Sequence, residues 1–218
     1  MIKTTVRAFA IAALALLPLT AATTTPAHAE ETLSLHDAIE ALPQAAESRE
    51  GYERTKFKHW IDEDKDGCNT RAEVLLAEAV TEPTINAGCK LTGGTWLSYY
   101  DETVVEGPSG LDIDHMVPLA EAWDSGASQW TPERRQAYAN DLGAERSLVA
   151  VTAKTNRSKS DQDPAEWMPP APAARCTYLS DWVGTKLRWL LTVDRSERDT
   201  LRELAAPCED TDVEYEQA

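Results

Sequence analysis

The sequence predicts an α+β protein, a mostly helical single domain built around a small strand element. Of its 218 residues, 42% are hydrophobic and 27% are charged, as is typical of a globular chain. Apolar residues recur at helical spacing in several segments, whereas Leu111 to Val117 alternates as a half-buried strand does. No Gly/Ser linker or internal repeat divides the chain after residue 29, so we expect one folded domain over 30–218.

The first 29 residues have a different composition from the rest. Lys3 and Arg7 precede an apolar run over 8–22, and Ala27-His28-Ala29 has the small-x-small pattern that signal peptidase recognises. We therefore expect a Sec-type signal peptide over 1–29, cleavage after Ala29, and a secreted, extracellular protein. A membrane anchor is the alternative, but the run is shorter than the roughly 18 to 20 apolar residues that a span needs. We expect no membrane attachment after processing.

The elements of the domain can be predicted in order. Ser34 begins a capping box before Leu35, Ile39 and Leu42, which predicts a helix that Pro43 ends. By spacing, caps and composition, further helices are predicted over 51–61, 70–80, 119–125, 131–142, 153–160 and 181–191. Strands are predicted over 93–100, 111–117 and 148–152, with a β-hairpin element in the region of the first two. An acidic tail over 209–218 is expected to be frayed.

Four cysteines are expected to form two disulfides, because their number is even and the chain is predicted to be exported. Three connectivities are possible. We favour Cys68 with Cys89 and Cys176 with Cys208, because cysteines that are neighbours in sequence close short loops. The absence of a Cys-x-x-Cys motif argues against a zinc site.

The strongest chemical signal is the pair Asp114-His115 at the end of a predicted strand. A carboxylate beside an imidazole suits metal-assisted hydrolysis, in which Asp114 holds a divalent cation and His115 activates water. An Asn carbonyl that accepts from one ring nitrogen would fix the tautomer, and Asn140 is the candidate. For an isolated Asp-His pair, the alternative is a structural histidine that bonds to its neighbour.

Further motifs follow this pair. The sequence contains Asp-His-Met-Val-Pro-Leu at 114–119, Asn-Asp-Leu at 140–142, Asn-Arg-Ser-Lys at 156–159 and Pro-Ala-Glu-Trp at 164–167. Together they resemble the secreted branch of the HNH endonucleases, also called His-Me finger or ββα-metal nucleases. The resemblance covers about residues 93–170. It implies a ββα-metal core, phosphodiester hydrolysis and one divalent ion, Mg²⁺ or Mn²⁺.

The resemblance also implies roles for individual residues. His115 would be the general base, while Asp114 and Asn156 would be ligands of the ion. Asn140 would be the orienting residue, although ordinary HNH nucleases have that Asn just before the second strand, where this chain has Ser147. From the helix that carries Asn156, Arg157 and Lys159 are candidates for binding phosphate, with solvated surface charges as the alternative.

The net charge of −16 excludes a basic coat protein for nucleic acid, because phosphate affinity comes mainly from Lys and Arg. The stretch from Arg134 to Lys159 nevertheless holds six basic residues against Asp141 and Glu145. We therefore expect the protein to bind DNA, or alternatively RNA, without sequence preference. We also expect a monomer.

A second motif lies before the Asp-His pair. Asp62, Asp64, Asp66 and Glu73 stand at positions one, three, five and twelve of an EF-hand-like Asp-x-Asp-x-Asp-Gly loop, the pattern that supplies oxygen ligands to Ca²⁺. The alternatives are an acidic turn without an ion, or a loop that directs Arg71 toward the leaving phosphate. The last role is implied by upstream arginines in secreted HNH-type nucleases.

Two functions are consistent with these observations. The first is an extracellular metal-dependent endonuclease that hydrolyses DNA or RNA. The alternative is a secreted calcium-binding or cell-surface interaction protein in which the nuclease site has decayed. Intact Asp114, His115 and Asn156 favour the first.

Overall fold

The computed structural model describes residues 30–218, and the predicted signal peptide at 1–29 lies outside them. The described residues fold as one α+β domain, which confirms the predicted fold class. The helices are α1 Leu35–Ala41, α2 Thr70–Ala77, α3 Leu119–Asp124, α4 Pro132–Ala139, α5 Ala153–Lys159, α6 Arg175–Trp189 and α7 Arg195–Ala205. The strands are β1 Glu31–Ser34, β2 Thr84–Asn86, β3 Lys90–Thr92, β4 Thr95–Ser98, β5 Thr103–Glu106, β6 Leu111–His115, β7 Leu148–Thr152 and β8 Asp212–Tyr215.

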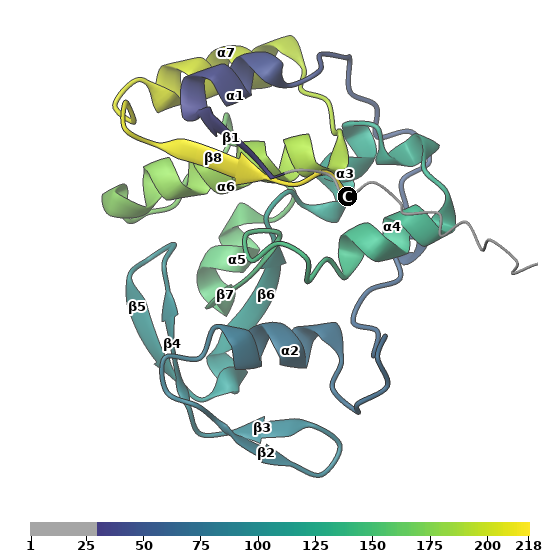
Figure 1. The fold of residues 1–218 in the computed structure, drawn as a ribbon, viewed down its shortest axis with the longest axis vertical. Coiled ribbons are helices and arrows are strands. Elements are labelled where there is room, and N and C mark those ends of the chain that lie inside the picture. Colours follow the sequence, from purple (N-terminus) through teal and green to yellow (C-terminus); the bar gives the residue numbers. More distant parts are fainter. Residues whose placement is uncertain (1–29) are drawn as a thin grey trace, which may run out of the picture.

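The strands pair into small antiparallel sheets of two strands each, β1 with β8, β2 with β3, β4 with β5 and β6 with β7. In Figure 1, α1 and α7 lie over the β1–β8 pair and α6, whereas α2 and the two hairpins β2–β3 and β4–β5 form the opposite end. The β6–β7 pair and α5 lie between these two parts. The centre of the domain is therefore a two-stranded unit followed directly by a helix.

The β6–β7 pair is buried on both faces. Ile113 and Ala150 belong to a smaller apolar core with α2 and β4, whereas Val149 and Val151 belong to the larger core with the helices of the other end. Successive strand residues point to opposite faces, so each strand contributes to both cores. Because Asp114 is paired with Val149, its side chain lies on the face of the larger core.

Several predicted elements are confirmed. The Ser34 side chain accepts a hydrogen bond from the Asp37 amide and begins α1, and Thr131 caps α4 in the same way. Strand 148–152 has the predicted bounds, and α2, α3 and α5 lie inside their predicted ranges. Helix α6 begins earlier than predicted, at Arg175.

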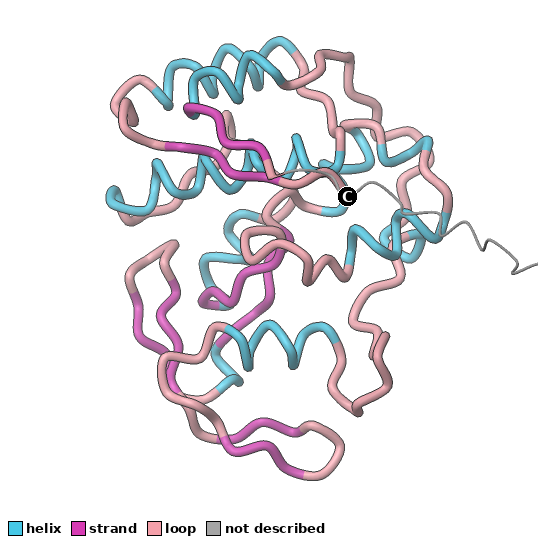
Figure 2. Tube along the Cα trace, viewed as in Figure 1, coloured by secondary structure: helices cyan, strands magenta, loops and turns pink. Residues whose placement is uncertain are grey.

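Two predictions were wrong. Residues 51–61 contain only a short 3-10 turn, Arg54–Lys56, in the long loop between α1 and α2 that Figure 2 shows. Tyr52 and Phe57 instead pack edge-on against Trp123, which an irregular segment can achieve without helical spacing. The acidic tail is not frayed along its length, because β8 pairs with β1 and buries Val213.

The disulfide pairing is confirmed. Cys68 is bonded to Cys89 and Cys176 to Cys208, and no described cysteine is free. The first bond ties the acidic loop to the β2–β3 hairpin, and the second joins α6 to the segment after α7. Among the described residues, no helix is both long enough and apolar enough to span a membrane.

Candidate active site

Asp114 occupies the end of β6 and is almost fully buried. Its Oδ2 atom accepts a hydrogen bond of 2.7 Å from the Tyr100 hydroxyl and lies 2.7 Å from the ammonium of Lys159. The same ammonium donates to the backbone carbonyl of His115 at 3.1 Å. Burial raises the pKa of the Asp114 carboxyl, and the adjacent Lys159 charge opposes that shift. The carboxylate is therefore held in one orientation by two donors on one oxygen.

His115 is equally buried, and its ring is held from one side. Nε2 lies 3.0 Å from the backbone carbonyl of Ala139, at the end of α4. A carbonyl can only accept, so Nε2 carries the proton and Nδ1 keeps its lone pair. Burial lowers the pKa of His115 to about 3, and the charge of Arg54 also lowers it. The imidazole is thus neutral at physiological pH.

Aromatic rings enclose the imidazole. Trp60 lies 5.4 Å from it between ring centroids, and Tyr138 stacks on it at 6.4 Å. His59 meets it edge-on at 6.3 Å. This packing fixes the ring plane and removes water from all but the pocket side, which is the physical cause of the lowered pKa.

Asn156, on α5, faces the same pocket as Asp114. Its Nδ2 lies 3.4 Å from Oδ2 of Asp112, so its amide oxygen remains available as a ligand. Asp112 also pairs with the guanidinium of Arg157 at 3.3 Å, and Arg157 is largely exposed. One carboxylate thus positions the amide of Asn156 and an arginine at the pocket rim.

The pocket that joins these groups has a volume of about 480 Å³. It brings Asp114, His115, Asn156 and Arg157 together, as the sequence predicted, and adds Arg54 from the 3-10 turn, which the sequence analysis did not select. No local motif distinguishes Arg54, since it is about 60 residues away from the Asp-His pair in the chain. A second pocket, of about 430 Å³ between α2, β7 and α6, is lined by none of these groups.

Asn140, predicted to orient His115, lies near the site without a side-chain contact to the imidazole. The amide of Asn140 accepts from Ile61 and Thr70 and donates to the carbonyls of Lys58 and Gln136. These bonds fix the end of α4, where the preceding residue supplies the carbonyl that holds His115. Asn140 therefore affects the imidazole indirectly, because it holds the backbone next to the Ala139 carbonyl that contacts Nε2 of His115.

Arg71 and Lys159 also differ in placement from the roles expected of them. Arg71 donates to the carbonyl of Leu111 at 2.9 Å, at the opposite end of β6 from His115, and does not line the pocket. Lys159 is 0% exposed, so in this conformation its ammonium meets Asp114 and not a phosphate.

The acidic loop before α2 forms a separate cluster. Oxygens of Asp62, Asp64 and Asp66 lie within 4.8 Å of one another, and all three side chains are exposed. The backbone amides of Asp66, Gly67 and Cys68 donate to these carboxylates. Gly67 has a φ of +100°, which side chains other than hydrogen rarely permit. Burial, then the three aspartates, raise the pKa of Glu73. Glu73, predicted to be the fourth ligand, does not belong to the group of oxygens that lie within 4.8 Å of one another.

The fold and the pocket define a class before any comparison. An antiparallel pair of strands followed by a helix presents a carboxylate, a neutral imidazole and an amide oxygen to one opening. Such a group of side chains is suited to hydrolysis of an anionic substrate.

Comparison with known proteins gives the family. Residues 43–204 match the family described as GmrSD restriction endonucleases, C-terminal domain, and the chain belongs to that family. An uncharacterized secreted protein of Arthroderma benhamiae is 39% identical over 175 residues, which cover 80% of this chain and 83% of the relative. No solved structure matches. The family places the protein among endonuclease-type hydrolases, whose substrate is nucleic acid.

Proposed function

We propose that the protein is an exported endonuclease of the HNH type, which hydrolyses phosphodiester bonds of DNA with a divalent cation and little sequence preference. One observation carries the proposal. Asp114, the neutral base His115 and Asn156 line a single pocket, although Asn156 is about 40 residues away from the other two in the chain. RNA is the alternative substrate, and a cleavage assay on both polymers separates them.

The donor set fits a hard divalent cation. Asp114 and Asn156 would hold it through one carboxylate oxygen and one amide oxygen, the ligand types that Mg²⁺ and Mn²⁺ take. When bound, the ion supplies Lewis-acid stabilisation of charge on the phosphate. Two protein ligands leave room for a phosphate oxygen and water.

The residues of this chain perform the remaining steps. His115 takes a proton from the attacking water at Nδ1, while the Ala139 carbonyl keeps the ring in the required tautomer. Arg54 and Arg157 line the pocket and bind the phosphate, since guanidinium groups match its geometry. Arg54 thereby takes the role for which the sequence had suggested Arg71.

Export and a monomeric state are part of the proposal. Export is supported by the two disulfides and by the name of the Arthroderma benhamiae relative. We place the mature domain at 30–218, after a signal peptide that ends at Ala29.

A plasmid-degradation assay tests the function. The mature protein should nick supercoiled DNA in Mg²⁺ or Mn²⁺, and a chelator should abolish nicking. Arg54→Ala should reduce cleavage by about tenfold or more, because a lost phosphate contact weakens binding of the transition state. Arg71→Ala is the matched control and should change cleavage far less. The absence of nicking with every metal tested would refute the proposal.

We further propose that the acidic loop is a Ca²⁺ site that stabilises the fold and takes no part in the reaction. Three clustered carboxylates support this role. Calcium should raise the melting temperature of the intact protein, since an ion that binds the native state stabilises it. Asp64→Ala should remove that rise and leave most of the cleavage activity. If calcium leaves the melting temperature unchanged, the loop is an acidic turn.

A further inference from the structure

The buried ammonium of Lys159 has an unusual position for a residue of a cation-binding pocket. It lies 2.7 Å from Oδ2 of Asp114, the carboxylate proposed to hold a divalent cation. Tyr100 donates to the same oxygen, so the two contacts that orient the carboxylate both run to Oδ2. Neither contact involves Oδ1, which is therefore the oxygen left for a ligand.

The ion pair of Asp114 and Lys159 also affects the charge of the pocket. Asp114 and Lys159 together carry no net charge, whichever of the two holds the proton. Asp112 pairs with Arg157 at 3.3 Å. Arg49 pairs with both Asp161 at 2.6 Å and Asp124 at 2.5 Å, so these three groups together carry one negative charge. Asn156 is neutral, and Arg54 has no ion pair among the described residues, as the salt bridges show. The charges around the pocket thus sum to about zero, although the whole chain is strongly acidic.

A neutral pocket with two protein ligands attracts a divalent cation only weakly, because the attraction between ion and site scales with the charge of the site. The acidic loop differs from the pocket in this respect. Its three clustered carboxylates form no salt bridge with a described basic side chain. A phosphodiester brings one negative charge to the pocket, and it would supply the attraction that the protein side chains do not.

We propose that Lys159 is a positioning residue that makes retention of the catalytic cation depend on the nucleic acid: the ion and the phosphate backbone bind together, and neither binds this pocket tightly alone. The proposal rests on the proposed function. Tyr100 shares the orienting role but carries no charge, so it sets the geometry of Asp114 and not the dependence on phosphate. By thermodynamic linkage, the cation must then tighten nucleic-acid binding by the same factor by which nucleic acid tightens cation binding.

The experiment uses the mature protein with His115→Ala, so that DNA is bound but not cut. The affinity for a fluorescent DNA duplex is measured by anisotropy with and without Mn²⁺, and the melting temperature is measured with and without Mn²⁺ in the absence of DNA. In this parent, Mn²⁺ should tighten DNA binding by about tenfold or more, a coupling within the usual range. Mn²⁺ alone should shift the melting temperature only as far as the acidic loop accounts for.

Two further variants in the same background separate charge from geometry. Lys159→Met should bind Mn²⁺ about tenfold or more tightly without DNA, which appears as a larger Mn²⁺-dependent rise in melting temperature, and its coupling to DNA should fall. Tyr100→Phe should keep the coupling between Mn²⁺ and DNA binding. In the protein with His115 intact, Tyr100→Phe should lower kcat. Arg195→Met, which removes an exposed cation on α7 that does not line the pocket, is the control and should behave like the parent.

Outcomes that contradict the proposal differ from those that contradict the proposed function. If the protein with His115 intact cleaves DNA but Mn²⁺ does not tighten DNA binding by the His115→Ala parent, the proposal fails and the nuclease function stands. If Lys159→Met folds and shows the same Mn²⁺-dependent rise in melting temperature as the parent, the proposed role of the Lys159 charge also fails. If Lys159→Met does not fold, the coupling in the parent still decides. Absence of cleavage with every metal overturns both.

Discussion

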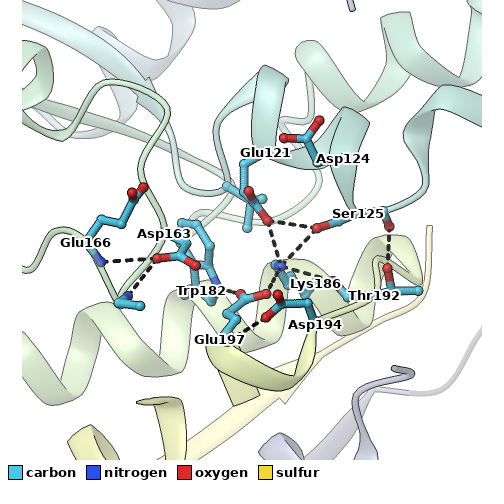
Figure 3. Close-up of polar contacts among 12 residues, drawn as sticks. Glu121, Asp124, Ser125, Asp163, Glu166, Trp182, Lys186, Thr192, Asp194 and Glu197 are labelled. Carbon is cyan, nitrogen blue, oxygen red and sulfur yellow. Dashed lines mark hydrogen bonds and ion pairs between the residues drawn. The ribbon is translucent and has the colours of Figure 1, made fainter. Parts of the chain in front are cut away.

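Two lysines, Lys159 and Lys186, are completely buried in this protein, and they lie in regions with opposite character. Lys186, on α6, lies among polar side chains of neighbouring elements, as Figure 3 shows. Its ammonium contacts Glu197 at 2.6 Å, Glu121 at 3.0 Å, Ser125 at 3.1 Å and the Thr192 carbonyl at 3.0 Å. Lys159 has one carboxylate partner, and that partner opens onto the pocket.

The pKa directions follow from the number of partners. Burial lowers the pKa of Lys159, and the single Asp114 does not fully offset it. Burial opposes ionisation of Lys186 in the same way, but Glu197 and Glu121 together raise its pKa. A buried ammonium with two carboxylates is a closed unit that joins α3, α6 and α7. The buried ammonium of Lys159 has a single carboxylate partner, Asp114, and that carboxylate also lines the pocket.

The largest expected effect tests whether the Lys186 region is structural. Lys186→Met leaves Glu121 and Glu197 buried without a cation, and breaking a buried ionic network in this way costs about 3–5 kcal/mol of unfolding free energy. Urea denaturation measures the loss, with Lys154→Met as the exposed control. Cleavage per folded molecule should not change. A loss below about 1 kcal/mol would show that the cluster does not stabilise the core as described.

His115→Ala tests the opposite expectation for the pocket. Removal of the proposed general base should lower cleavage by about 100-fold or more, the usual size of such a contribution, with little change in melting temperature. His36→Ala, on the exposed side of α1, is the matched control. A folded His115→Ala protein that retains full activity would contradict the mechanism. Lys186→Met should lower stability without changing activity, and His115→Ala should lower activity without changing stability.

The smallest effect concerns Glu47, whose carboxylate lies within 4.8 Å of those of Glu121 and Glu197. Burial, then Glu121, raise the pKa of Glu47 to about 8. Because the folded-state pKa lies above the unfolded value, the contribution to stability is complete below about pH 4.5 and is lost as the pH rises through about 8.

Glu47→Gln should therefore remove part of the fall in stability between pH 5 and pH 9. After a discount for the partial exposure of Glu47, we expect about 1 kcal/mol. Melting temperatures measured across this range for both proteins test it, with the exposed Glu50→Gln as control. Parallel pH profiles for the two proteins would mean that Glu47 titrates normally.

Local sequence was sufficient for most elements but not for all. Residues 148–152 are β-branched and apolar, and a strand formed with those bounds. The aromatic residues of 51–61 suggested a helix, yet Tyr52 and Phe57 meet Trp123 across an irregular segment. Strand β8 depends on β1, which is far away in the chain, so no local pattern indicated that the acidic tail pairs.

The candidate site shows the same division. Helical geometry alone could have separated Arg157 from Lys159, since residues two apart are about 200° apart around a helix and face opposite sides. Lys159 is buried and Arg157 is exposed, as that geometry requires. Nothing in the spacing of residues indicated Arg54, because it enters the pocket from a loop whose path is set by packing.

The sequence by itself determined the cysteine pairs, because short loops favour neighbouring cysteines, and it placed Asp114 beside His115, because the two are adjacent in the chain. Only the tertiary structure decided how those groups are held. The Ala139 carbonyl at the imidazole and the Tyr100 hydroxyl and Lys159 ammonium at Asp114 come from other elements. Contacts between distant segments depend on how the two cores pack against β6 and β7, and residue spacing does not encode that packing.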